Sequence, residues 1–158
     1  VEKGMEGFEI GPKEDKLGIR GSDTHTLQFN DVKVPKENRI GEDGFGFKFA
    51  MKTLSGGRIG IAAQALGIAS GAYELALKYS KERKAFGTEI CNHQAIAFKL
   101  ADMYTDVTAA SHLVMKSAWD KDQGNNYDQS SDMAKLYASK VAMEHTVEAV
   151  KFTAETAL

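Results

Sequence analysis

The chain has 158 residues, 42% of them hydrophobic, and its 20 Lys and Arg nearly balance 22 Asp and Glu, giving a formal net charge of -2. This charge balance argues against a protein that binds polyanions. The length allows a hydrophobic core, because a domain of about 150 residues buries ~68–70% of its unfolded surface. The single cysteine, Cys91, excludes an internal disulfide, and no apolar run approaches the ~20 residues that a membrane span needs.

The first 40 residues have the pattern of strand and loop. Residues 8–10 form a short alternating run that the following Gly-Pro pair should stop. Residues 26–34 predict a longer strand, in which the side-chain alternation slips at Asn30 and Asp31. Such a slip indicates a bulge or a tight bend, and Pro35, which cannot donate to a β-ladder, should end the strand.

From residue 41 the pattern becomes helical, and a first helix is expected from about residue 44 to residue 84. Its expected apolar face is Phe45, Phe49, Leu54, Ile61, Leu66, Tyr73 and Ala76 or Tyr79. The glycines inside it are Gly56, Gly57, Gly60, Gly67 and Gly71. Each costs ~1 kcal/mol relative to Ala, so their number predicts close backbone approach to another helix or to a ligand. Gly87 should end this helix in a left-handed conformation.

Two further helices are expected. Asn92 is the expected N-cap of the second, and a Gly-Asn-Asn run beginning at Gly124 should end it. Its apolar residues recur every 3.6 positions: Ile96, Leu100, Met103, Val107, Ala110, Val114 and Ala118. A third helix should run from Asp128, as a possible cap, to near the end, with a core face of Ala134, Ala138, Val141 and Ala142. Helices with short links pack antiparallel, so an up-and-down bundle is predicted.

Generic catalytic and metal-binding patterns are absent from the sequence. His25, His93, His112 and His145 form neither a Glu-x-x-His nor a His-x-x-x-His pair, so no metal site is predicted. The sequence has no Gly-x-Ser-x-Gly elbow, Walker loop or Rossmann glycine pattern after a strand. Lysines alternate with acidic residues instead of forming a basic nucleic-acid face.

Two arginines are candidates for anion binding. Arg83 could stabilise the negative end of the first helix, worth ~0.3–1 kcal/mol, or hold a phosphate in bidentate fashion. Phe86 beside it could cover a flat ring or simply close the helix end by a hydrophobic contact. Arg58, inside an apolar helix, should either pair with an internal acid or meet an anionic ligand. Gln94 could be merely solvated.

Several segments resemble the acyl-CoA dehydrogenases, flavoenzymes that oxidise acyl thioesters, in order and in spacing. They are residues 17–22, 29–38, 41–47, 57–69, 82–87 and 93–103. The resemblance implies a mainly α fold. Residues 1–40 would be the C-terminal remnant of the family's middle β-domain. Residues 41–158 would be three long antiparallel helices of its C-terminal four-helix bundle, which would lack its last helix.

The resemblance also implies FAD held across a subunit interface. Arg83 matches the arginine of the family's Glu-Arg-x-x-Phe-Gly motif, which contacts the FAD of the neighbouring subunit. Phe86 and Gln94 fall on FAD-contact positions of the family. Ala85 stands where some members have Thr, so a hydroxyl contact is lost there.

On the substrate side, Arg58 matches the family's arginine near the acyl-CoA, and Ser55 stands where many members have Asp. The family's catalytic base is a Glu in a downstream Tyr-Glu-Gly-Thr motif or, in some members, the residue before the helix arginine. The motif is not in this chain, and Gly57 occupies the second position. No catalytic residue is therefore expected, and we expect an inactive fragment of a short-chain acyl-CoA dehydrogenase, whose parent performs α,β-desaturation.

The implied partners of the parent are an acyl-CoA substrate, electron-transfer flavoprotein as acceptor, and three further copies in a dimer of dimers. The resemblance implies no nucleic acid and no membrane span, and a place in the bacterial cytoplasm or the mitochondrial matrix. Two alternatives remain at this stage. One is a related flavoprotein with other chemistry, such as nitroalkane oxidation or a nucleic-acid-associated role, and the other is a helical interaction module without catalysis.

The last eight residues depart from the resemblance. After Val150 the family continues with Gln or Lys and then Ile-His-Gly-Gly-x-Gly, whereas this chain reads Lys-Phe-Thr-Ala-Glu-Thr-Ala-Leu. Deleting one A from an A-rich run that encodes Lys-Ile-His-Gly-Gly-Asn-Gly-Phe can reproduce all eight observed residues. We expect this tail to be a frameshift product; the alternative is a divergent helix end.

Overall fold

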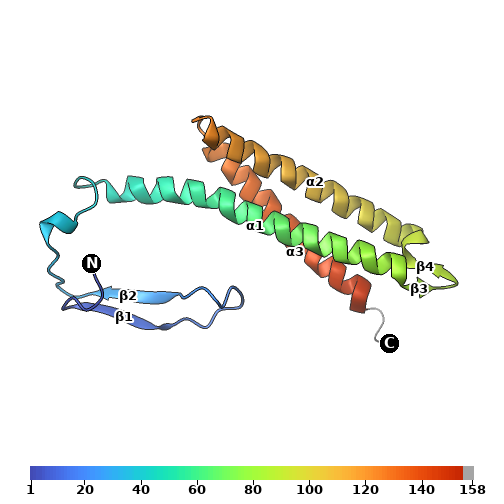
Figure 1. Ribbon diagram of the computed structural model, residues 1–158, viewed down its shortest axis with the longest axis horizontal. Helices are drawn as coiled ribbons and strands as arrows, with labels where there is room; N and C mark the ends of the chain where they lie inside the picture. The colour runs from blue at the N-terminus through green and yellow to red at the C-terminus, as the bar shows by residue number, and fades with distance from the viewer. Residues whose placement is uncertain (155–158) are drawn as a thin grey trace. The chain divides into compact units, whose positions relative to one another are not determined.

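The computed structural model describes residues 1–154 and divides into two compact units, residues 1–46 and residues 47 onward (Figure 1). In chain order the elements are β1 (Phe8–Lys13), β2 (His25–Phe29), η1 (Lys36–Asn38), α1 (Gly46–Glu82), β3 (Lys84–Ala85), β4 (Thr88–Glu89), η2 (Ile90–Asn92), α2 (Gln94–Asp122) and α3 (Asp128–Ala154). The predicted β segment followed by three long helices is confirmed.

The first unit is built on an antiparallel hairpin of β1 and β2. Phe8 lies opposite Phe29 in the register, and their rings stack with centroids 5.2 Å apart. The register shifts between Ile10 and Lys13, where the Gly-Pro pair lies. The expectation that this pair stops the strand is therefore wrong: β1 continues past it through an irregularity, which absorbs the residue that cannot donate to the ladder.

β2 ends at Phe29, five residues earlier than expected. The predicted bend at Asn30 and Asp31 is confirmed, and it is what ends the strand. Asp31 has a φ of 48°, and the Asn30 N–H donates to the Gly7 carbonyl at 2.8 Å. Gly7 has a φ of 80°, and a Cβ there would lie 2.0 Å from the Asn30 oxygen, so this close approach requires glycine.

α1 begins and ends within two residues of the predicted bounds, but it buries a different face. Its buried residues are Ser55, Ala62, Ala65, Ala69, Ala76 and Ser80. Of the predicted apolar face Ala76 is buried, and Leu66 and Tyr73 are half-buried against the core, whereas Phe49, Leu54 and Ile61 are about half exposed. The buried face of α1 thus consists of small side chains, and its larger apolar side chains are more exposed.

The cores of α2 and α3 agree well with prediction. Leu100, Met103, Ala110 and Val114 are buried on α2, and all four predicted core residues of α3 are buried. These residues form two clusters with the alanines of α1, and consecutive helices run in opposite directions (Figure 1). The predicted antiparallel arrangement is confirmed, and Gly124, with a φ of 71°, follows the end of α2 as expected.

The helix glycines do not serve close packing within the described part of the chain. A Cβ placed at Gly57, Gly60, Gly67 or Gly71 would meet no atom within 4 Å. At Gly56 it would meet only the flexible end of Lys121, at 3.5 Å. The expectation of close backbone approach is therefore wrong for contacts inside this unit.

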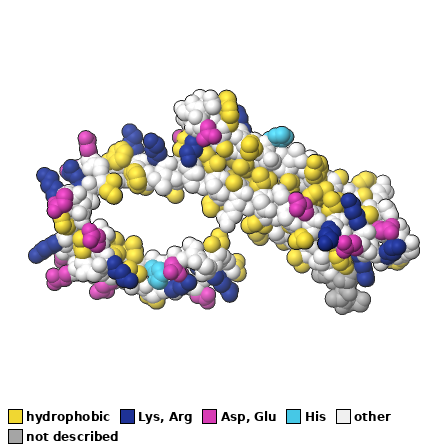
Figure 2. Space-filling model, viewed as in Figure 1, with side chains coloured by type: hydrophobic (Ala, Val, Ile, Leu, Met, Phe, Trp, Pro, Cys, Tyr) yellow, Lys and Arg dark blue, Asp and Glu magenta, His cyan; other side chains and the backbone are white. Residues whose placement is uncertain are grey.

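Judged by length and composition alone, α1 is long and apolar enough to cross a membrane. The expectation that no segment reaches this threshold is thus wrong. The same composition suits a core helix of a bundle, and the alanines of α1 pack into one cluster with α2 and α3. Hydrophobic side chains are also spread over the visible face of the helical unit (Figure 2).

The first residues of the departing tail are helical. Residues up to 154 continue α3, and Phe152 is buried in a cluster with Ala76, Leu100 and Met103. Residues 155–158 lie outside the described residues. A buried aromatic side chain at position 152 is compatible with either origin of the tail, because the family places an apolar Ile at this point.

Candidate functional site

A short hairpin between α1 and α2 carries two of the four predicted cofactor-side residues, Ala85 and Phe86. β3 and β4 pair antiparallel, and the two residues between them are Phe86 and Gly87, with φ values of 52° and 85°. Positive φ at both central positions is the type I′ turn that suits a two-residue hairpin. Gly87 is therefore left-handed as predicted, but it forms this turn and does not cap the helix, which ends at Glu82.

Side chains at the base of the hairpin hold it closed. Asn92 Nδ2 donates to Thr88 Oγ1 at 2.8 Å and to Glu89 Oε2 at 3.1 Å. Lys84 Nζ lies 3.4 Å from the other Glu89 oxygen, and a backbone N–H together with this ammonium lowers the pKa of Glu89. The expectation that Asn92 caps the second helix is wrong. α2 begins at Gln94, and Asn92 instead braces the hairpin.

His93 fixes the tip of the hairpin. Its Nε2 lies 3.1 Å from the Ala85 carbonyl oxygen, and its ring meets the Phe86 ring edge-on with centroids 6.0 Å apart. The Phe86 side chain is 98% exposed. An aromatic ring held in solvent at a left-handed backbone position is an arrangement that suits contact with a second molecule.

The four predicted cofactor-side residues are brought together here. Arg83 follows the last residue of α1, Ala85 and Phe86 lie on the hairpin, and Gln94 is the first residue of α2. Arg83 and Gln94 are both exposed, and within residues 1–154 the Arg83 guanidinium has no hydrogen bond or ion pair. A free guanidinium can take a phosphate in bidentate fashion, and an exposed ring can cover a flat one, so these residues fit a phosphate-bearing aromatic cofactor.

The two predicted substrate-side residues also meet. The Arg58 guanidinium donates to Ser55 Oγ at 3.3 Å, and Ser55 is buried. Arg58 Nε lies 3.0 Å from Asp132 Oδ1 on α3. Of the two alternatives for Arg58, the structure therefore shows a pairing with an acid. Asp132 could not be found from the sequence, because only the packing of α3 on α1 brings it near.

The two groups are distinct places on the molecule. Arg58 and Arg83 are 25 residues apart along α1, and at 1.5 Å per residue this is about 37 Å. They cannot hold the same small group.

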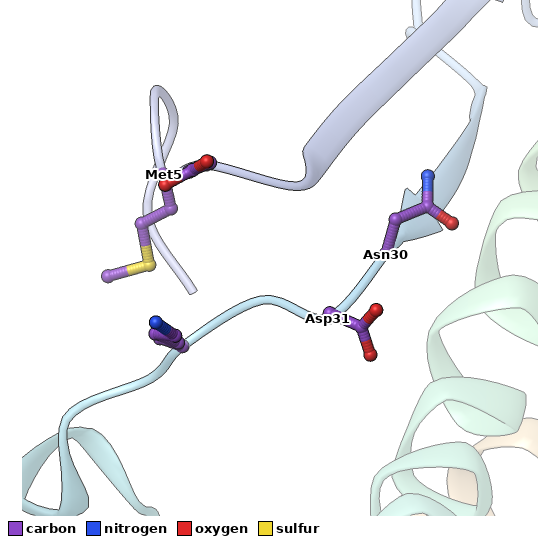
Figure 3. Close-up of a pocket in the computed structure, with 5 residues that line it drawn as sticks. Met5, Asn30 and Asp31 are labelled. Atoms are coloured by element: carbon purple, nitrogen blue, oxygen red, sulfur yellow. The ribbon is translucent and has the colours of Figure 1, made fainter.

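The predicted site residues do not line the cavity of residues 1–46. That cavity has a volume of 460 Å³ and is lined by Met5, Glu6, Asn30, Asp31 and Lys33. Figure 3 shows Met5, from the segment before β1, facing the segment after β2 that carries Asn30 and Asp31. Among the described residues no hydrogen bond or ion pair joins the acidic groups here to Lys33, and we assign this cavity no chemistry.

A known protein family matches mainly the helical unit of the chain. The sequence model for the C-terminal domain of acyl-CoA dehydrogenases matches residues 44–155. A short-chain-specific acyl-CoA dehydrogenase from Megasphaera elsdenii is 54% identical over 151 residues, which are 96% of this chain and 39% of that protein. Subunit CarC of the caffeyl-CoA reductase-Etf complex from Acetobacterium woodii is 47% identical over 96% of this chain and 40% of its own length. The chain thus spans about two fifths of the curated relatives it matches.

Solved structures share the fold. Butyryl-CoA dehydrogenase from Megasphaera elsdenii has a TM-score of 0.91 at 53% identity, over 97% of this chain and 40% of that chain. A structure described as PigA with FAD and proline has a TM-score of 0.92 at 25% identity, over 96% of this chain and 40% of that chain.

Proposed function

The chain belongs to the acyl-CoA dehydrogenase family, and we propose that it is part of a short-chain enzyme that desaturates acyl-CoA between Cα and Cβ. The observation that carries this proposal is the hairpin after α1: Phe86 is exposed at its turn, and Arg83, just before it, has no ion pair among the described residues. This family is FAD-dependent, and the hairpin offers the charge and the flat surface that such a cofactor needs.

In this proposal Arg83 holds a phosphate of FAD that belongs to a neighbouring subunit, and Phe86 covers one of its rings. Gln94, at the start of α2, would add a hydrogen bond, while Ala85 would offer only its backbone, whose carbonyl contacts His93. When bound, FAD accepts the hydride from the acyl β-carbon. The chain's own residues bind and orient the cofactor by charge and by ring contact.

On the substrate side, we propose that Arg58 and Ser55 face the acyl-CoA. Asp132 already pairs with Arg58, so an anionic group of the ligand would share the guanidinium with this carboxylate or displace it. The α-proton must go to a base. Gly57, next to Arg58, has no side chain that can accept it, and we assign no catalytic residue to this chain.

The wider setting is also proposed from the family. The parent would be a dimer of dimers that passes electrons to electron-transfer flavoprotein, in the bacterial cytoplasm or the mitochondrial matrix. The similarity to CarC, whose complex name includes Etf, supports such a partner. It also favours, as a second candidate, a relative that reduces an acyl-CoA double bond with the same cofactor.

Flavin retention in the parent protein tests the proposal. Arg83→Ala should weaken FAD binding about 10- to 100-fold, because a charge-assisted hydrogen bond contributes ~1.5–3 kcal/mol. Arg83→Lys should restore only part of it, since an ammonium cannot bind in bidentate fashion. Lys81→Ala, which removes a cation from the last turn of the same helix, is the matched control. Flavin absorbance after gel filtration gives the occupancy, and unchanged occupancy in Arg83→Ala would return Arg83 to a helix-end role.

A further inference from the structure

A second polar cluster lies between α2 and α3, and the proposed FAD contacts do not use it. Asp106 on α2 is held by two side chains of α3: the Tyr137 hydroxyl donates to Oδ1 at 2.8 Å, and His145 Nε2 lies 3.4 Å from Oδ2. His145 is only 3% exposed, and its Nδ1 is buried with no hydrogen-bond partner among the described residues. The Asp106 carboxylate is thus oriented by two side chains of α3.

A cavity of 220 Å³ opens beside this cluster, lined by Lys99, Asp102, Met103, Asp106, Glu144, His145 and Glu148. Its one lysine pairs with Glu148 at 2.8 Å, and Glu144 has Lys140 only at 3.9 Å. In the described part of the chain, Asp102 has no ion pair and Asp106 has none with a lysine or arginine. The cavity therefore carries an excess of negative charge.

The size of the cavity limits what it can hold. It is smaller than the ~300–1,000 Å³ typical of sites for drug-sized ligands, and much larger than the ~30 Å³ of one water. Among residues 1–154 no group of three or more His, Cys, Asp or Glu side chains is placed to bind a metal ion. A single organic cation the size of a side chain fits these limits.

The cavity adjoins an apolar groove on α3. This groove has a volume of 510 Å³, is lined by Met143, Glu144, Val147, Glu148 and Lys151, and shares its two glutamates with the acidic cavity. Met143 is 68% exposed and Val147 47%. The acidic cavity and the apolar groove together are complementary to a helix that carries apolar residues and one cation on the same face.

We propose that this surface docks a helix of a partner protein through an arginine whose guanidinium enters the cavity between Asp102 and Asp106. Each Asp106 oxygen accepts one hydrogen bond inside the chain and keeps a lone pair for a second, so the carboxylate can still receive a planar, bidentate donor. Arginine fits this better than lysine, whose ammonium cannot reach both oxygens with parallel bonds. The apolar side chains of the partner helix would rest on Met143 and Val147.

Nuclear magnetic resonance of the histidine-labelled full chain tests the proposal. The probe is an alanine-based helical peptide with one Arg and two Leu one turn apart, and its matched control has citrulline, which is neutral, in place of Arg. The Arg peptide should shift the ring signals of His145 saturably and leave those of His112, which is exposed on α2, unchanged. Arginine amide alone should shift the same signals at higher concentration.

Variants separate binding from folding. Asp106→Asn should weaken the Arg peptide about tenfold or more, whereas Asp122→Asn, at the end of α2 and outside the cavity, should not. Should Asp106→Asn fail to fold, Tyr137→Phe removes one orienting hydrogen bond, keeps the ring and should weaken binding to a smaller degree. No saturable shift, an equal shift with the citrulline peptide, a peptide that binds no tighter than arginine amide, or unchanged binding in both variants would each overturn the proposal.

Discussion

The open row of glycines on α1 leads to a quantitative prediction. Gly60 and Gly67 lie inside the helix, and a Cβ at either would meet no atom within 4 Å. Ala loses less backbone entropy than Gly on folding, so Gly60→Ala and Gly67→Ala should each raise the free energy of unfolding by about 0.5–1 kcal/mol. The sites are two turns apart, about 10 Å, so the double variant should gain about 1–2 kcal/mol.

Urea and thermal unfolding of the purified chain measure this gain. For a chain of this size 1 kcal/mol corresponds to about 2–4 °C, so the double variant should melt roughly 2–8 °C higher. Gly124→Ala is the matched control. It has equally open surroundings but a φ of 71°, so it should destabilise the chain by about 1–2 kcal/mol. If the α1 substitutions destabilise the chain instead, another molecule or another copy packs against these glycines. The close backbone approach expected from the sequence would then hold for that contact.

Three further outcomes are expected. The Lys116 ammonium, 2.6 Å from Asp120 Oδ1, lowers the pKa of Asp120. The ionised Asp120 carboxylate should therefore stabilise the fold fully above its unfolded pKa of about 3.9, and this stabilisation should disappear as the pH falls through the lower native pKa. Urea midpoints measured against pH should show the loss, and Asp120→Asn should abolish it. The 158-residue chain with FAD, butyryl-CoA and an artificial acceptor should show no turnover above the flavin blank, because Gly57 cannot act as base; clear turnover would contradict this. Resequencing of the gene should show His-Gly-Gly codons in the frame adjacent to residues 151–158, and their absence would disprove a frameshift.

The sequence predicted α2 and α3 far better than α1, for a physical reason. In α2 and α3 residues of the predicted core faces, such as Leu100 and Val141, are buried, although larger residues outside those faces, such as Leu136, are exposed. In α1 the predicted face followed the large apolar residues, and Phe49, Leu54 and Ile61 are about half exposed. The face that packs consists instead of small side chains, Ala62 and Ala69 among them, which belong to the core cluster with α2 and α3.

Motif and chemistry singled out the candidate residues but could not name their partners within the chain. The sequence marked Arg58 as a cation that needs an acid or an anion, and the acid proved to be Asp132 on another helix. Asp106 and His145 left no signal, because neither belongs to a spaced motif and only the register of α2 against α3 joins them. Such long-range pairs depend on packing, which a single sequence does not display.

At the hairpin the sequence predicted the conformation of Gly87 correctly but its structural role wrongly. Glycine after a cationic helix end is typical of a left-handed helix cap, and Gly87 is indeed left-handed. What decides its role is Phe86, whose own positive φ costs about 1–2 kcal/mol in a residue with a Cβ. The contacts of Asn92 with Thr88 and of His93 with Ala85 offset that cost, and both come from residues after the turn. The residues just before α2 therefore support the strained position, which holds an aromatic ring in solvent next to Arg83, an arginine without an ion pair in the described part of the chain.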